Sequence, residues 1–530
     1  MNELISYYNS EGSTDFSRFE KEGYYMIMLA LRTRDCSQIW NKYSVIASLG
    51  IINQTHSNTG IKVLSSNLPN QPGWKVGQPY DDAGGLYGLG LLQADKPADD
   101  IKKYLREQLS AAIETMSGNT NNELLTGASM GCSLAFIATN DVDITNLLEA
   151  ILLYDVPLPS EAACLGMGIV NYSKFDTALI KKLLAFSSHT QHEKILRSIG
   201  VAISMLVAHS NENCLEVVNE IISHENEFIR MGGVLSLGTA YFQNTNNDII
   251  ARLLKLIIDD ASDEVKHMAV MALCFVYLGT SEFVNALETF KMLIDSFNYR
   301  IRYAAASAIG LIAAGTGDRN ALELLLLVIN DSHELVRQAA LISLGMIYMG
   351  ISDRMILYQR KENTPTIDIG DISVTKLPIY PTPTEVRDLL VTLACNSYDD
   401  VMVRVGALYG LGFLTASGSN ATLATVRRVI EKNNETNPGM KKLLESQKWV
   451  GSFISPVRAI GFILYTQFWY WYPFILNITL SFVPQALIAV TEDGIAPEDF
   501  NLRLNLKSFK AVLKLWKLML KITNNIMDDG

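Results

Sequence analysis

The sequence predicts an all-α solenoid of helical-hairpin repeats, about eleven in number and 35–40 residues each. A short segment rich in Gly, Ala and Ser returns along almost the whole chain, as in GGVLSLGTA (Gly232–Ala240) and AALISLGMI (Ala339–Ile347). From Ser133 to Gly345 its copies are 34 to 36 residues apart, a period typical of helical solenoids. The chain has 530 residues, which a solenoid reaches by adding units, whereas a single core stops growing at roughly 250–300 residues.

Each copy is anchored on one small residue that we expect in mid-helix. The eleven anchors are Gly50, Gly90, Ser133, Gly168, Ser204, Gly238, Cys274, Gly310, Gly345, Gly412 and Gly461. Gly inside a helix costs about 1 kcal/mol relative to Ala, so a compensating gain is expected. Small residues four apart, such as Ala306 and Gly310, form flat strips on which a neighbouring helix packs closely. We therefore expect tightly stacked helices and an array that closes, or nearly closes, on itself.

One unit shows how a repeat is built. Ile301–Ala314 has the apolar spacing of a helix, Gly315–Asp318 breaks it, and Ala321–Ile329 predicts a second helix. Asp331 stands three residues before Glu334, the spacing of a capping box, and predicts the start of the next unit.

Composition narrows the class of protein. Hydrophobic residues make up 48% and charged residues 19%, which is low for an exposed superhelix and indicates a surface covered by ring closure or by partners. The net charge is −11 and no basic stripe follows the repeats, so a nucleic-acid ligand is not expected. The six cysteines form no CxxC pair, and the amino terminus lacks the pattern of a signal peptide. Both features favour a reduced, intracellular protein.

The chain divides into four predicted parts. Residues 1–43 form a short helical lead-in, 44–455 the repeats, 456–505 a buried aromatic segment and 506–530 a basic amphipathic helix. An insertion at about 361–385 contains four prolines, which forbid a continuous helix. We expect this insertion to be a mobile connector and not a docking motif.

Ala459–Thr491 is a stretch of 33 residues without a charge, long enough to span a bilayer. Pro473 and Pro484 oppose a span, and the aromatic cluster Phe468–Tyr472 lies in its middle and not at an interface. A buried aromatic plug is the preferred interpretation, with short strands expected only after Pro473. A membrane-associated repeat protein stays as a remote alternative.

No catalytic, cofactor or metal site is predicted. Gly127–Gly131 matches the G-x-S-x-G motif of serine hydrolases, but Ser129 falls inside a predicted repeat helix, where packing is its expected role. His189 and His192 precede Glu193 in an order unlike that of zinc hydrolases and are expected in a turn. A serine hydrolase is the other remote alternative.

Five lysines, Lys507, Lys510, Lys514, Lys517 and Lys521, follow one side of the predicted terminal helix. Such a helix caps the last repeat, or docks on an acidic partner or a membrane, and the sequence leaves these readings open.

The repeat segments resemble the proteasome/cyclosome-repeat family, which includes the two largest non-ATPase subunits of the proteasome regulatory particle. Asp81–Asp95, His189–Ser204 and Thr466–Val490 are similar to one of those two subunits and not to its sister. The similarity extends from about Tyr43 to Asn505. The sister subunit and a cyclosome scaffold are the alternatives within this family.

The resemblance implies a toroid of eleven repeats in two concentric rings, acting as a scaffold without catalysis or cofactor in the cytoplasm and nucleus. Its implied partners are the ATPase coiled coils and lid subunits, including the deubiquitinase module. A long helical rod precedes the toroid in the family, whereas about forty residues do so here. The final residues do not match the tail that recruits a ubiquitin receptor, so the resemblance does not carry receptor docking over. A naturally short member and a fragment are both compatible with the sequence.

Overall fold

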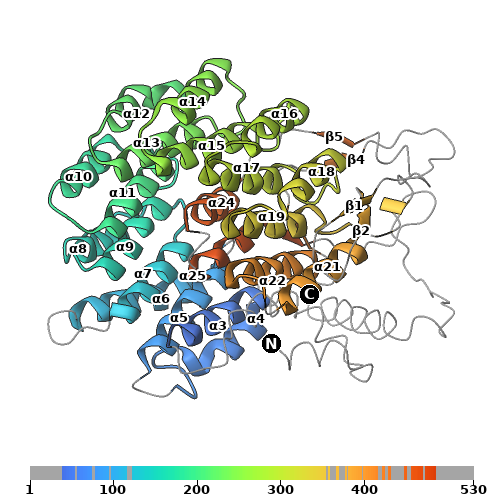
Figure 1. The fold of residues 1–530 in the computed structure, drawn as a ribbon. Coiled ribbons are helices and arrows are strands. Elements are labelled where there is room, and N and C mark those ends of the chain that lie inside the picture. The colour runs from blue at the N-terminus through green and yellow to red at the C-terminus, as the bar shows by residue number, and fades with distance from the viewer. Residues whose placement is uncertain are drawn as a thin grey trace, which may run out of the picture.

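Helices of two kinds alternate along the chain in the computed structural model (Figure 1). The structure describes residues 39–53, 57–74, 78–94, 97–115, 122–351, 353, 356–357, 366–368, 376–378, 380–396, 398–415, 421–423, 428–430, 447–449, 455–468 and 472–484. The expected lead-in before residue 39 and the basic terminal helix lie outside these residues.

The A helices carry the small-residue segments, and consecutive A helices pack against one another. They are α3 (Ile39–Ile52), α5 (Pro79–Gln93), α7 (Asn122–Ala135), α9 (Pro157–Val170), α11 (Glu193–Leu206), α13 (Glu227–Ala240), α15 (Asp263–Tyr277), α17 (Tyr299–Ile312), α19 (Glu334–Ile347) and α22 (Val401–Thr415). In α9 every residue from Pro159 to Val170 is buried. A helix that is apolar all round is stable only when it is covered on all sides, as these helices are.

The B helices alternate with the A helices, and each packs mainly on the A helix that follows it. They are α4 (Ser57–Leu64) with the 3-10 turn η1 (Ser65–Asn67), α6 (Asp99–Glu114), α8 (Val142–Leu152), α10 (Thr177–Ser187), α12 (Leu215–Ile222) after η3 (Asn211–Cys214), α14 (Asn247–Asp259), α16 (Phe283–Ile294), α18 (Arg319–Val328) and α21 (Pro383–Cys395). They are amphipathic: α14 buries Ile249, Leu253 and Ile257, which are four residues apart. The predicted hairpin is thus confirmed in α17 and α18.

Three antiparallel pairs of three-residue strands interrupt this pattern. They are β1 (Thr366–Asp368) with β2 (Lys376–Pro378), β3 (Ala421–Leu423) with β6 (Phe482–Pro484), and β4 (Arg428–Ile430) with β5 (Gln447–Trp449). The expectation that strands occur only after Pro473 was wrong, because only β6 lies there. The first pair lies in the proline-rich insertion, where chain that cannot form a helix satisfies backbone groups by pairing instead. The insertion also ends earlier than predicted, since Thr382 and Glu385 form a capping box at the start of α21.

The carboxy-terminal segment consists of α24 (Pro456–Phe468), α25 (Tyr472–Ile475), η5 (Leu476–Ser481) and β6, and it lies among the A helices in the middle of the array (Figure 1). α24 contacts α11, whereas α25 and η5 contact α3. The rings of Phe468 and Phe474 are buried and stack with centroids 4.6 Å apart. In the part of the chain that the structure describes, no helix has both the length and the apolar character that crossing a membrane requires.

A turn with left-handed backbone follows five of the A helices and binds the next repeat. Its N–H group donates to a carbonyl in the last turn of the following A helix. The donor–acceptor pairs are Ala138–Ile169, Ser173–Met205, His209–Thr239, Gln243–Phe275 and Gly315–Met346, at 2.9–3.1 Å, and the donors have φ between 55° and 65°. Because the last carbonyls of a helix have no partner within it, each repeat completes the hydrogen bonding of the next.

This geometry predicts opposite effects of exchanging Ala and Gly at equivalent turns. Gly315→Ala should lower the free energy of unfolding by about 1 kcal/mol, because an L-residue is strained in the left-handed region. Ala138→Gly should leave that free energy unchanged or raise it. Urea denaturation followed by circular dichroism measures both, and an equal loss in the two variants would contradict the role of backbone strain.

Candidate functional site in the contacts between repeats

The anchors lie in ten A helices and in α24, and Gly50, Gly90, Gly168, Gly238, Gly310 and Gly345 lie where two A-helix backbones meet. A Cβ atom at Gly168 would lie 2.8 Å from the Cα of Ala202 on the next A helix, and one at Gly238 would lie 2.6 Å from the Cα of Ala272. Such distances leave no room for a side chain. At Gly461 in α24 the nearest atom is instead the carbonyl oxygen of Asn477, 2.7 Å away.

Three anchors are not glycine, and each directs its polar atom to a backbone carbonyl. The hydroxyl of Ser133 donates to the carbonyl of Ser129 at 2.6 Å, and that of Ser204 donates to Val201 at 2.7 Å. The thiol of Cys274 donates to Ala308 on the next A helix at 3.7 Å. A small polar side chain is therefore accommodated at an anchor when it bonds to nearby backbone.

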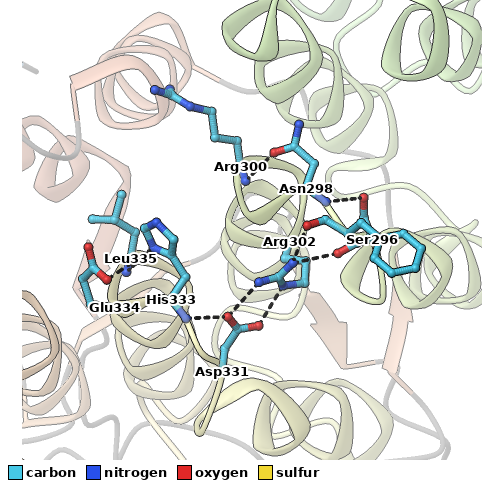
Figure 2. Close-up of polar contacts among 9 residues, drawn as sticks. Ser296, Asn298, Arg300, Arg302, Asp331, His333, Glu334 and Leu335 are labelled. Carbon is cyan, nitrogen blue, oxygen red and sulfur yellow. Dashed lines mark hydrogen bonds and ion pairs between the residues drawn. The ribbon is translucent and has the colours of Figure 1, made fainter.

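At their amino-terminal ends, neighbouring A helices are joined by ion pairs that we call arginine staples: Arg230–Asp260, Arg302–Asp331 and Arg337–Asp399. Each arginine is the fourth residue of its A helix, and each aspartate lies just before the next A helix. In the staple of α17, Arg302 Nε is 2.7 Å from Asp331 Oδ2 and Nη2 is 2.9 Å from Oδ1, a two-pronged contact (Figure 2). The side chains are only 15% and 9% exposed, so the pair is largely removed from water.

The same guanidinium also holds the loop that precedes its own helix. Arg302 Nη1 donates to the carbonyls of Ser296 at 2.8 Å and Phe297 at 3.0 Å (Figure 2). Asp331 in turn accepts the N–H of His333 at 2.8 Å. One ion pair therefore fixes the loop before α17 relative to the loop before α19.

The prediction of a capping box at Asp331 was wrong. The N-cap of α19 is His333, whose side chain accepts the N–H of Leu335 at 3.3 Å. The carboxylate of Asp331 is bound to Arg302 instead. Burial tends to raise the pKa of Asp331, but the hydrogen bonds from Arg302 and from the His333 N–H hold that pKa below its usual value.

At the α15–α17 interface, which lies between two stapled interfaces, other residues stand at the staple positions. Lys266 stands at the arginine position of α15, and Ser296 stands at the aspartate position. A different set of contacts joins these helices: Arg300 pairs with Glu264, and Asn298 Nδ2 donates to Asp263 Oδ1 at 2.7 Å. At this interface both residues of the staple, the arginine and the aspartate, are thus replaced.

Sequence reasoning missed the staples, although a signal was present. Arg230, Lys266, Arg302 and Arg337 recur at the period of the repeat, and Asp260, Ser296 and Asp331 follow the same period. A search for recurring charge, and not only for recurring small residues, would have found them.

The candidate catalytic residues lie in structural positions. Ser129 is fully buried in the middle of α7, and its hydroxyl has no hydrogen-bond partner among the described residues. It therefore lacks the strand–turn–helix setting of a nucleophile elbow. His189 and His192 lie in the turn between α10 and α11, as expected, and Glu193 pairs with Arg197 at 2.6 Å. Within the described ranges no group of three or more His, Cys, Asp or Glu residues is placed to hold a metal ion.

Comparison with known proteins identifies relatives of this architecture. The chain is similar to the 26S proteasome non-ATPase regulatory subunit 1 homolog B of Arabidopsis thaliana, with 30% identity over 460 residues, 87% of this chain and 40% of the relative. It is 30% identical over 458 residues to the 26S proteasome regulatory subunit RPN2 of Candida glabrata, 86% of this chain and 43% of the relative. The rpn2 subunit of Schizosaccharomyces pombe is 27% identical over 461 residues. No family model matches the chain.

These relatives confirm the resemblance drawn from the sequence. The three segments singled out there favoured the non-ATPase subunit numbered 2 of the 26S proteasome regulatory particle, and the fungal relatives carry that number. The plant relative is named as non-ATPase regulatory subunit 1. The chain spans about two fifths of the length of the relatives it matches.

The close approach of A helices predicts that Gly310→Leu destabilises the protein. A Cβ atom there would lie 2.8 Å from the Cα of Ser343 and closer still to its side chain. Overpacking of this kind typically costs about 1–3 kcal/mol. Thermal melting should show the loss, whereas Glu288→Leu, at a side chain of α16 that is 70% exposed, should melt like the parent. Equal melting temperatures for Gly310→Leu and the parent would contradict the close-approach argument.

The staples predict a pH-dependent loss of stability. Arg302→Met should lower the free energy of unfolding by about 1–3 kcal/mol at neutral pH, because Asp331 loses its charged partner. The pKa of Asp331 is depressed in the folded state, so its contribution is complete above the unfolded pKa of about 4 and is lost as pH falls through the folded value. The difference between parent and variant should therefore shrink in acid. Arg319→Met, which removes an exposed pair, is the control, and a loss as large in this control would contradict the prediction.

Proposed function

We propose that this chain is a non-catalytic scaffold of the regulatory particle base. The reason is that it is homologous, over 87% of its length, to non-ATPase regulatory subunits of the 26S proteasome. In this role it organises ATPase subunits and lid subunits, including the deubiquitinase module, for ubiquitin-dependent protein degradation. The observation that carries the proposal is the identity of about 30% across nearly all of the repeats. Such a subunit works in the cytoplasm and the nucleus.

The proposal includes closure of the repeats into a toroid. Its support is the carboxy-terminal segment, which touches repeats that are far apart in sequence: α3 at one end of the array and α11 in its middle. At the other end, the ring of Phe482 meets Phe413 of α22 edge-on, with centroids 5.8 Å apart. Because one segment contacts both the first and the last A helix of the array, a closed ring is favoured over an open superhelix.

Within this ring we assign the eleven anchors to helix spacing and not to ligand binding. We also keep the predicted division into repeats at 44–455 and an aromatic segment at 456–505, because α24 begins at Pro456 and its phenylalanines are buried. The interfaces between repeats then supply rigidity, and partners bind to the exposed B helices and loops. Docking of a ubiquitin receptor is not part of this proposal.

Purification of the tagged chain from its own cells tests the assignment. ATPase and lid subunits of the proteasome should co-purify with it in constant proportion. Recovery of cyclosome subunits instead would favour the alternative within the family, and recovery of neither set would contradict the proposal.

A truncation tests whether docking belongs to the repeats. Deleting Lys507–Gly530 should lower the melting temperature more than it lowers recovery of ATPase and lid subunits at matched expression, because we expect this segment to cap the array. Loss of both sets of partners, with the helical circular dichroism intact, would show that docking depends on the terminal segment instead.

A further inference from the structure

Large apolar side chains are exposed along one edge of four consecutive repeats, from α14 to α22. We call this set the apolar rim, and its members are Ile258, Met292, Phe297, Leu327, Tyr398 and Val401. Three of them lie in the last turns of α14, α16 and α18, and three lie in the loops before α17 and α22 or at the start of α22. These places adjoin, because a short loop joins the end of each B helix to the start of the next A helix. Single exposed apolar residues are ordinary, whereas such a row indicates an interaction surface.

The opposite edge of the same repeats differs. Among the described residues, the ends that join A helices to B helices expose two large apolar side chains, Val284 near the start of α16 and Leu357 after α19. The members of the apolar rim are 65–107% exposed. The arrangement is therefore one-sided, and a partner meets it at the edge where the arginine staples lie.

Both aromatic residues of the apolar rim stand on loops that the staples hold. The carbonyl of Phe297 accepts a hydrogen bond from Arg302 at 3.0 Å. The N–H of Tyr398 donates to Asn396 Oδ1 at 3.1 Å, and Asn396 Nδ2 donates to Asp399 of the next staple at 2.8 Å. An exposed aromatic ring on a fixed loop loses little conformational freedom on binding, which suits it to anchor a partner.

The exposed charges beside the apolar rim are mainly acidic. Three exposed carboxylates without an ion pair to another described residue lie within three residues of it: Asp259, Asp295 and Asp400. Of the exposed lysines described at these helix ends, Lys291 pairs with Glu288 at 3.9 Å, and Lys255 lies one turn before Ile258. The charge therefore favours a partner whose apolar residues are accompanied by Lys or Arg.

The spacing of the apolar rim matches a helix lying across the repeats. Neighbouring packed helices are roughly 8–10 Å apart. A helix rises about 10 Å in seven residues, so it brings an apolar residue of one face to each repeat in turn. In an extended strand, residues of one face recur about every 7 Å, which does not match this spacing. The loops of Phe297 and Tyr398 are two repeats apart, a separation of about three to four helical turns.

We propose that the apolar rim binds a basic amphipathic helix of a partner protein. The helix lies across the ends of α14, α16 and α18, with Phe297 and Tyr398 as the aromatic anchors at its apolar face. Its Lys or Arg residues lie near the exposed carboxylates beside the apolar rim. The staples then have a second role, because they hold the anchoring loops in place. This inference does not rest on the proteasome assignment.

Three fluorescein-labelled peptides with blocked ends test the proposal on the full chain. The first contains three copies of Leu-Lys-Lys-Leu-Lys-Ala-Lys, which places leucine on one face of a basic helix. The second has the same composition with its leucines spread around the helix, and the third has Glu in place of every Lys. In fluorescence polarisation the first peptide should bind about tenfold more tightly than either of the others.

Substitutions in the protein test where the peptide binds. Phe297→Ser should weaken binding of the first peptide about tenfold, and Met292→Ser should weaken it several-fold. Val284→Ser is the matched control, because Val284 and Met292 are 68% and 71% exposed at opposite ends of the same helix. Asp295→Asn should weaken binding several-fold at low salt and less at high salt. All these side chains are exposed, and thermal melting checks that each variant is folded.

Equal binding of the first two peptides, no saturable binding, or equal losses in Met292→Ser and Val284→Ser would overturn the proposal. Concentration-dependent dimerisation that Phe297→Ser abolishes would assign the apolar rim to a second copy of this chain instead. Peptide binding that appears only after Lys507–Gly530 is deleted would assign it to the chain's own terminal segment. Either of these two results would also overturn the proposal.

Discussion

The close approach of neighbouring A-helix backbones is the constraint on which the rest of this structure depends. Where Gly168 meets Ala202 and Gly238 meets Ala272, the two backbones leave no room for a side chain. Helices that pack so tightly bury nearly all of their residues, so their middle turns accept only small or apolar side chains. The arginine staples consequently lie at the helix ends, whereas the middle turns make only short hydrogen bonds such as that from Cys274 to Ala308. The B helices carry the amphipathic character of the array.

The contacts between repeats differ at the two ends of the A helices. At the carboxyl ends, left-handed turns donate N–H groups to the last carbonyls of the next A helix, so the backbone itself joins the repeats. At the amino ends of α13, α17 and α19, the arginine staples join the helix to the next A helix. Because Arg302 binds both the loop before α17 and the loop before α19, its staple fixes the register of adjacent units as well as their spacing. Between α15 and α17, Arg300 and Glu264 join the helices instead, and a cavity lies beside them.

These interfaces suit a protein that holds others in place. The repeats that begin with α13 and α17 are bonded to the next repeat at both ends of the A helix, and consecutive A helices pack closely along the array. A displacement of one unit is therefore transmitted to its neighbours. The carboxy-terminal segment adds contacts between units that are distant in sequence. Ser129 is fully buried in the interior of α7, and the described part of the chain gathers no set of three or more possible metal ligands.

The sequence alone determined the helical class, the length of the repeat and the positions of the small residues, because these follow from spacing within a single helix or hairpin. It also identified the relatives, through segments that periodicity does not explain. The sequence alone did not predict which residues of different repeats contact each other. Asp331 has the spacing of a capping residue, and only the position of Arg302 on the preceding helix decides that its carboxylate binds elsewhere. Likewise, β3 pairs with β6, and Gln467 meets Arg197 around one cavity, because folding brings distant segments together and no local pattern records which ones meet.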